Sequence, residues 1–98
     1  MSRSLPLSGR VALVTGVSRR AGIGFALVQR LLADGARVLA TGWEPHDDEM
    51  PWGRDPAGRE SVLREFGASP DAFEYAHADM ELPETPAALL DRTVARFG

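Results

Sequence analysis

A short apolar run that leads directly into a glycine-rich turn limits the possible folds of this chain more than any other feature. Residues Val11–Val14 are all apolar, which is typical of a strand buried on both faces in a parallel sheet. The segment 15–24 that follows reads TGVSRRAGIG, and helical spacing of apolar residues begins at Ile23. Because glycine permits tight turns and close approach of the backbone to a ligand, this segment predicts a strand, a ligand-facing turn and a helix.

The rest of the chain alternates between helical and strand patterns. The predicted helices cover 23–34, 60–66 and 85–97, and the further predicted strands cover 37–41 and 72–79. The order is that of an α/β Rossmann fold, a doubly wound parallel sheet, with helices on alternating sides of its strands. In the complete fold a fourth strand lies beside the first one, so we expect residues 1–98 to be an incomplete, N-terminal half with an exposed sheet edge.

Two segments lead to more detailed expectations. The last helix is expected to have Thr85 as its N-cap, with proline in its first turn and an apolar stripe of Leu90, Val94 and Phe97. The segment 43–58 contains three prolines and both tryptophans without a helix or strand period, so it is expected to be a long loop. Its two tryptophans either cover a bound adenosine or substrate, or anchor the loop onto the body of the protein.

Composition excludes several classes of chemistry. The chain has no cysteine, and all eleven basic residues are arginine, so disulfides, thiolate nucleophiles and lysine Schiff bases are excluded within it. Residues 1–33 carry five arginines and no acid, whereas residues 34–98 carry fourteen acids and six arginines, which sums to −3. This balance predicts no nucleic-acid binding, and the absence of a long apolar run predicts no membrane span. A cytoplasmic protein is expected.

Some tempting patterns are assigned no chemistry. The run His46-Asp47-Asp48-Glu49 resembles a metal cluster, but adjacent loop side chains rarely converge on one ion, so it is expected to be a solvated acidic loop. His77 is expected to be a packed or edge residue of its strand. We therefore predict no metal site in the chain and assign these residues no catalytic role.

The glycine turn resembles that of the short-chain dehydrogenase/reductase family, which reads Thr-Gly, three residues, Gly-Ile-Gly. Residues 15–16 and 22–24 match this pattern, but five residues separate the matching glycines. Ser18-Arg19 matches the pair that precedes Gly-Ile-Gly in members of the 3-oxoacyl-carrier-protein reductase type, and 20–21 is interpreted as an insertion. The resemblance covers the chain from Gly9 to Gly98.

The resemblance implies a bound nicotinamide dinucleotide. The predicted cofactor-binding residues are Gly16, Ser18, Arg19, Arg20, Gly22, Ile23, Gly24, Asp79 and Met80. The second strand ends without the acid that usually bonds the ribose 2′-hydroxyl of NAD, and Arg19 or Arg20 suits a 2′-phosphate, so NADP(H) is favoured. Glu44 keeps NAD(H) open as the alternative. Asp79, at the end of the third strand, is expected to accept a hydrogen bond from the adenine amino group.

The resemblance also implies an activity, hydride transfer between nicotinamide and a small carbonyl or alcohol substrate. The family's catalytic tyrosine, lysine, serine and asparagine have no counterparts here, and the chain contains neither lysine nor asparagine. We therefore expect the 98-residue chain alone to be inactive, and full-length family members to form homo-oligomers. The alternative is a non-catalytic module that binds a nucleotide or docks onto a partner.

Overall fold

A parallel sheet forms the centre of the computed structural model, which describes residues 5–17, 22–53, 58–66 and 71–98. Its strands are β1 (Val11–Val14), β2 (Arg37–Gly42) and β3 (Phe73–His77), and its helices are α1 (Ile23–Ala33), α2 (Glu44–Glu49), α3 (Gly58–Phe66) and α4 (Thr85–Phe97). The strands are ordered β1-β2-β3, and both neighbouring pairs are parallel. The predicted α/β class with a partial Rossmann-like sheet is therefore confirmed.

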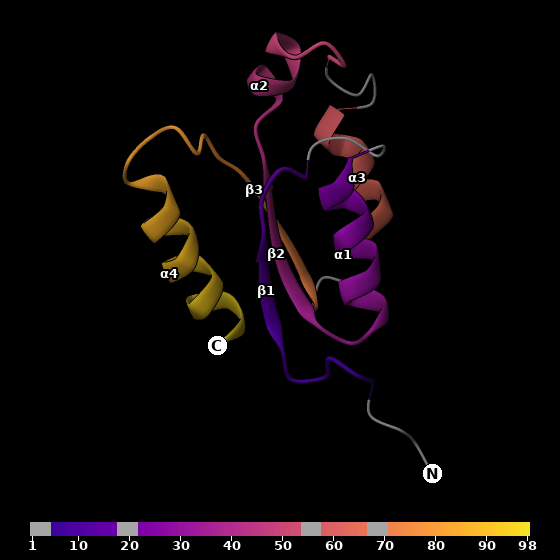
Figure 1. Cartoon of the computed structure of the whole chain (residues 1–98). Helices are drawn as coiled ribbons and strands as arrows, with labels where there is room; N and C mark the ends of the chain where they lie inside the picture. Colours follow the sequence, from indigo (N-terminus) through magenta and orange to yellow (C-terminus); the bar gives the residue numbers. More distant parts are fainter. Residues whose placement is uncertain (1–4, 18–21, 54–57, 67–70) are drawn as a thin grey trace.

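The helices cover the two faces of the sheet unequally. Helices α1 and α3 lie on one face and α4 lies on the other, while α2 lies beyond the carboxyl end of β2 (Figure 1). The expectation that helices alternate between the faces is wrong for α1 and α3. Both crossovers, β1 to β2 and β2 to β3, run in the same direction along the sheet, and right-handed crossovers in one direction place their helices on one face.

Each face of the sheet has its own apolar core. On the α1 and α3 face, Phe66 packs between Phe25 and Phe73, with ring centroids 4.9 Å and 5.2 Å apart. On the α4 face, Leu39 of β2 is fully buried against residues that include Leu89 of α4. Alternate residues of β2 therefore enter different cores, which explains why its apolar run is continuous.

Two sequence-based expectations about burial and loops are wrong. β1 was expected to be buried on both faces, but only Val14 of its four residues is buried, because β1 is the edge strand of the described sheet. The segment 43–58 was expected to be a loop, yet it contains the six-residue helix α2, and α3 already begins at Gly58. Pro45 is compatible with α2 because the first turn of a helix does not need its N–H group.

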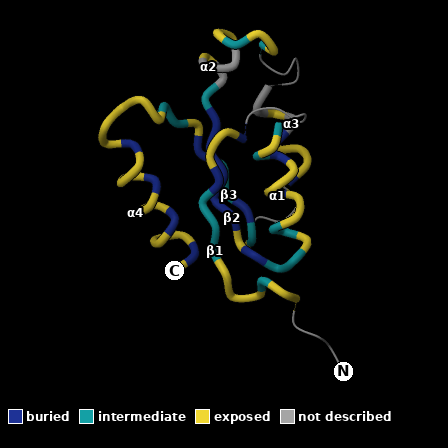
Figure 2. Tube along the Cα trace, in the orientation of Figure 1, coloured by how far each residue is buried: buried dark blue, intermediate teal, exposed yellow. Residues whose placement is uncertain are grey.

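Helix α4 buries a different face from the predicted one. Its buried residues are Thr85, Leu89, Thr93 and Phe97, whereas the predicted stripe residues Leu90 and Val94 are 56% and 64% exposed. Figure 2 shows the alternation of buried and exposed residues along this helix. The buried row is spaced by four residues, and Thr93 can enter it because its hydroxyl donates to the carbonyl oxygen of Leu89 at 2.7 Å.

The N-cap prediction for α4 is also wrong. Glu84 occupies the N-cap position and Thr85 is the first helical residue, with proline following it as expected. The Thr85 side chain is buried against the body of the protein, so packing rather than capping determines its role.

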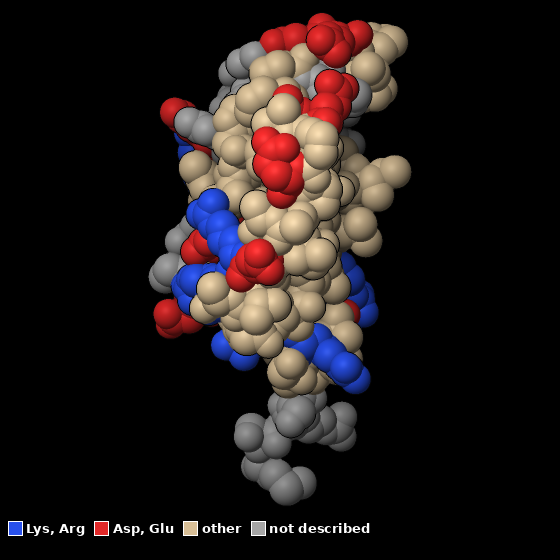
Figure 3. All heavy atoms as spheres, turned by 90° about the vertical axis from the view of Figure 1, so that its left-hand side faces the viewer, with Lys and Arg blue, Asp and Glu red and all other residues tan. Residues whose placement is uncertain are grey.

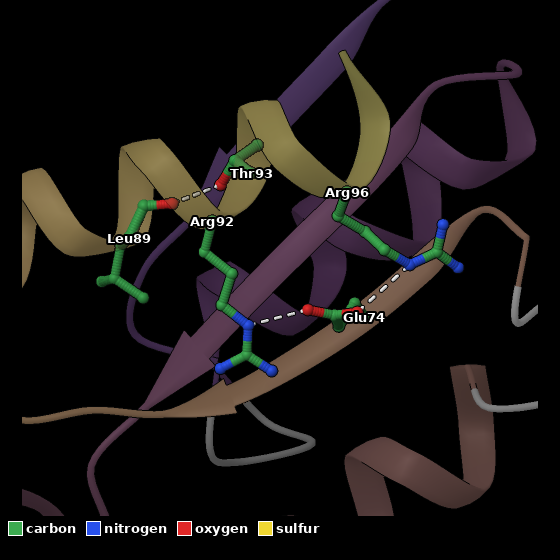
Figure 4. A network of polar contacts seen from close by, with 5 residues as sticks. All are labelled: Glu74, Leu89, Arg92, Thr93 and Arg96. Atoms are coloured by element: carbon green, nitrogen blue, oxygen red, sulfur yellow. Dashed lines mark hydrogen bonds and ion pairs between the residues drawn. The ribbon is translucent and has the colours of Figure 1, made fainter.

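Two ion pairs connect α4 to the sheet. Nε of Arg92 and Nε of Arg96 donate to the two carboxylate oxygens of Glu74 on β3, at 2.8 Å and 3.1 Å (Figure 4). Residues 92 and 96 are one helical turn apart, so both guanidinium groups reach the same strand residue. Within the described part of the chain, no helix is both long and apolar enough to cross a membrane.

Candidate functional site

The glycine turn after β1 exposes backbone. Gly16 has a φ of +75°, a conformation that is costly for residues with a Cβ, and no described atom lies within 4 Å of the position that a Cβ would occupy there. The next residue, Val17, is fully buried, and its N–H donates to the carbonyl oxygen of Thr41 at 2.9 Å. The turn is therefore held against the end of β2, while the Gly16 backbone faces open space.

The start of α1 lies against this turn more closely than any side chain would allow. A Cβ on Gly24 would lie 2.8 Å from the carbonyl oxygen of Gly16 and 3.0 Å from Cγ2 of Val17. Glycine at position 24 therefore lets α1 begin directly over the turn. The N-cap of α1 is Gly22, which has no side chain to bond the N–H groups of the first turn, and that turn carries no acidic residue.

A pocket of about 800 Å³ lies at the carboxyl end of the sheet, next to this turn. Its wall is built from four parts of the chain: the glycine turn and the start of α1, the end of β2, the α2 region, and the segment after β3. Six of the predicted cofactor-binding residues line it, namely Gly16, Gly22, Ile23, Gly24, Asp79 and Met80. The other three, Ser18, Arg19 and Arg20, lie outside the described residues.

Asp79 enters the pocket wall in a fixed orientation. Its Oδ1 accepts a hydrogen bond from the N–H of Glu81 at 2.9 Å, and its carbonyl oxygen accepts one from the N–H of Leu82 at 3.3 Å. The hydrogen bond from the Glu81 N–H therefore orients the Asp79 carboxylate. Asp79 is only partly buried, and it lines the pocket.

Several pocket residues were not predicted from the sequence as binding residues. Among them are Leu27 of α1, Thr41 at the end of β2, and Glu49 of α2. The Thr41 hydroxyl is buried and has no hydrogen-bond partner among the described residues. The position of Thr41 at a strand end was visible in the sequence, whereas Glu49 was missed because α2 was interpreted as a loop. The side chain of Glu44, the residue that kept NAD(H) open, lies outside the described residues.

The charged side chains that line the described pocket wall are all acidic. They are Glu49, Asp79 and Glu81, which come from α2 and from the segment after β3. On the side of the molecule that carries α4, acidic groups dominate the end where α2 lies, and most arginines lie toward the opposite end (Figure 3). Among the described parts of the pocket wall, an anion is favoured most beside the first turn of α1, where no side chain caps the helix.

These features fit a nicotinamide dinucleotide. The open backbone at Gly16 admits a phosphate, the pocket is in the size range of about 300–1,000 Å³ that is usual for small-molecule sites, and its wall is mostly apolar. The site also lies outside the carboxyl ends of parallel strands, where α/β proteins bind their ligands. The arrangement can hold a small-molecule ligand that combines a phosphate group with apolar surface.

Comparison with known proteins agrees with this geometry. The sequence is 35% identical over 92 residues to momilactone A synthase of Oryza sativa subsp. japonica, which corresponds to 94% of this chain and 28% of that protein. It is 34% identical over 96 residues to a 2,3-dihydroxy-2,3-dihydro-p-cumate dehydrogenase of Pseudomonas putida, covering 97% of this chain and 32% of that protein. The chain thus spans about a third of the length of these relatives. No family model and no solved structure matches it.

Both relatives are oxidoreductases of the short-chain dehydrogenase/reductase type. The narrower likeness to 3-oxoacyl-carrier-protein reductases, expected from Ser18-Arg19, has no support from these comparisons. At the level of the family, the comparisons support the resemblance of this chain to a part of a short-chain dehydrogenase/reductase.

Proposed function

We propose that this chain is the NADP(H)-binding part of a short-chain oxidoreductase that acts on a small carbonyl or alcohol substrate. The observation that carries the proposal is the pocket of about 800 Å³ at the carboxyl end of the parallel sheet, bounded by Gly16 and Gly24. A parallel α/β sheet binds nucleotides at this edge because loops and helix N-termini converge there. The relationship to two dehydrogenase-type proteins supports the same function.

In this proposal the glycine turn binds the pyrophosphate. The exposed backbone at Gly16 and the first-turn N–H groups of α1 are donors for phosphate oxygens, and the positive end of the helix dipole favours the anion. Asp79 is proposed to accept a hydrogen bond from the adenine amino group with the carboxylate oxygen that does not bond Glu81. Ser18 and Met80 complete the proposed cofactor contacts.

The proposed preference for NADP(H) rests on residues 19, 20 and 42. Gly42 ends β2 without a side chain, so no strand-end acid is available to bond the ribose 2′-hydroxyl of NAD. Arg19 and Arg20 belong to the glycine turn, and a guanidinium group binds a phosphate through paired hydrogen bonds. One of these two arginines is the proposed partner of the 2′-phosphate.

The bound dinucleotide supplies the hydride chemistry in such enzymes. The residues of this chain bind and orient it, and the closely packed turn at Gly16 and Gly24 holds it in a defined position. The chain contains no lysine and no asparagine, so the resemblance gives it no counterparts for those two catalytic residues. We therefore expect the 98-residue chain alone to bind the cofactor but not to reduce carbonyl compounds.

Calorimetric titration with NADPH and with NADH tests the proposal. We expect NADPH to bind more tightly, and we expect Arg19→Ala or Arg20→Ala to remove the difference while leaving NADH binding unchanged. Asp79→Ala is expected to weaken both dinucleotides about ten- to a hundred-fold, as the loss of one hydrogen bond to a charged group predicts. Tighter binding of NADH would overturn the NADP assignment, and no binding of either dinucleotide would overturn the proposed function.

A further inference from the structure

Trp52 lines the pocket from a tight turn that follows α2. The N–H of Gly53 donates to the carbonyl oxygen of Met50 at 3.0 Å, which closes a β-turn with Pro51 and Trp52 at its centre. Proline suits the first central position of such a turn because its ring fixes φ. The turn therefore holds Trp52 at the pocket wall, where the residue is 51% exposed.

Exposed apolar side chains from other elements line the same pocket. Ile23 is 82% exposed, Leu27 is 50% exposed and Met80 is 42% exposed, and they come from α1 and from the segment after β3. Large apolar side chains are rarely left in water around a single opening, and such groups commonly mark a ligand-binding groove. A flat, apolar ligand group would shield them together with the indole of Trp52.

The two tryptophans of the pocket have different environments. The ring of Trp43 packs against the ring of His77 on β3, with centroids 4.8 Å apart, and Trp43 is only partly exposed. Trp43 therefore lines the pocket while its ring packs against the sheet. Trp52 lies farther along the chain, beyond α2, and offers more of its surface to the pocket.

Charge determines which end of a dinucleotide the α2 side of the pocket can take. Glu49 of α2 makes this part of the wall acidic, and the segment after β3 adds Asp79 and Glu81 to the same pocket, so phosphate groups are disfavoured away from the glycine turn. The turn at Gly16 and the uncapped first turn of α1 favour phosphate instead. A neutral base with an amino donor is the part of the ligand that suits an acidic and apolar wall.

We propose that Trp52 stacks on the adenine ring of the bound dinucleotide and closes the adenosine end of the pocket. This inference rests on the proposed function and adds a binding residue from a segment that the glycine motif does not include. Stacking is favoured because the indole is rigid and every base presents a flat π face, which makes the contact effective without further hydrogen bonds. Trp52 is a binding and positioning residue here, with no part in the proton or hydride chemistry.

Adenosine diphosphoribose and nicotinamide mononucleotide, the two halves of the cofactor, test this assignment. In the Trp43→Phe variant Trp52 is the sole tryptophan, and we expect its fluorescence to be quenched by adenosine diphosphoribose but not by nicotinamide mononucleotide. By calorimetry, we expect Trp52→Ala to weaken adenosine diphosphoribose about ten-fold and Trp52→Phe to restore most of that loss. Leu90→Ala, an exposed apolar residue of α4 outside the pocket, is the matched control and is expected to change neither signal.

The outcomes separate this inference from the proposed function. Binding of adenosine diphosphoribose to the wild-type chain with the same affinity in Trp52→Ala would overturn the stacking contact alone. Quenching of Trp52 by nicotinamide mononucleotide instead would also overturn it, because the wrong half of the cofactor would lie there. A wild-type chain that binds neither half nor the whole dinucleotide would overturn the proposed function and this inference with it.

Discussion

The carbonyl oxygen of Gly16 and the Cα of Gly24 are so close that a Cβ on Gly24 would lie 2.8 Å from that oxygen. This contact joins the turn after β1 to the start of α1 and brings the exposed N–H groups of both together. The contact also explains why residue 24 is glycine although it lies in a helix, where glycine is otherwise unfavourable by about 1 kcal/mol relative to alanine.

Gly24→Ala is expected to lower the free energy of unfolding, although alanine is the better helix former. The backbone must shift to admit the Cβ, at a cost of about 1–3 kcal/mol that exceeds the gain in propensity. Urea unfolding measures the change, and NADPH affinity is expected to fall about ten-fold because the N–H groups move. Ala26→Gly, at an exposed α1 position, is the control, with lower stability but unchanged affinity. A more stable Gly24→Ala chain with wild-type affinity would contradict the close contact.

Gly16→Ala and Gly9→Ala form a pair that separates backbone strain from ligand binding. Both glycines have positive φ values, +75° and +83°, and a Cβ on either would meet no described atom within 4 Å. Alanine is expected to cost each variant about 1–2 kcal/mol of stability by strain alone. Only Gly16→Ala is expected to weaken NADPH binding, because only Gly16 lines the pocket. Equal affinities of the two variants in calorimetry would argue against a phosphate at Gly16.

Leu89→Ala and Leu90→Ala test which face of α4 is buried. Leu89 is 4% exposed and Leu90 is 56% exposed, although the two are neighbours with the same side chain. We expect Leu89→Ala to lower the free energy of unfolding by about 2–3 kcal/mol and Leu90→Ala by less than about 0.5 kcal/mol. Denaturant titrations of both variants provide the measurement. A larger loss at Leu90 would mean that the apolar stripe predicted from the sequence is the buried one.

Glu74→Ala is expected to loosen α4 from the sheet. The Glu74 side chain is 26% exposed, whereas those of Arg92 and Arg96 are 51% and 38% exposed, so solvent screens both ion pairs. The expected loss of stability is therefore modest, about 1 kcal/mol, and smaller in high salt. A double-mutant cycle with Arg92→Ala isolates the pair, and Asp91→Ala on the exposed side of α4 is the control. A coupling energy of zero would show that the pair of Glu74 with Arg92 does not stabilise the position of the helix.

Much of the fold could be predicted because it follows from local patterns. β1 was predicted with its observed bounds, and α1 and β2 to within one residue, because a continuous apolar run and a helical period do not depend on distant contacts. The burial of β1 could not be predicted from its own residues, although the missing fourth strand led us to expect an exposed sheet edge. It depends on which strands lie beside it, and β1 is at the edge of the described sheet.

The site was predictable in part for the same reason. Gly16 and Gly24 could be identified from the motif, since their role depends on a turn only a few residues long. Glu49 could not, because it reaches the pocket only through α2, in a segment whose proline content indicated a loop. For Trp52 the sequence left open whether the residue covers a ligand or anchors the loop, and the pocket places it at the ligand side.

By itself, the sequence determined the order of strands and helices, the parallel α/β class and the position of the glycine turn, because each depends on neighbours within about one helical turn or one strand. The tertiary structure alone decided that α1 and α3 share a face, that Leu89 rather than Leu90 is buried, and that Glu49 lines the same pocket as Gly16. Those relationships arise when segments far apart in the chain pack together, and local periodicity carries no information about them.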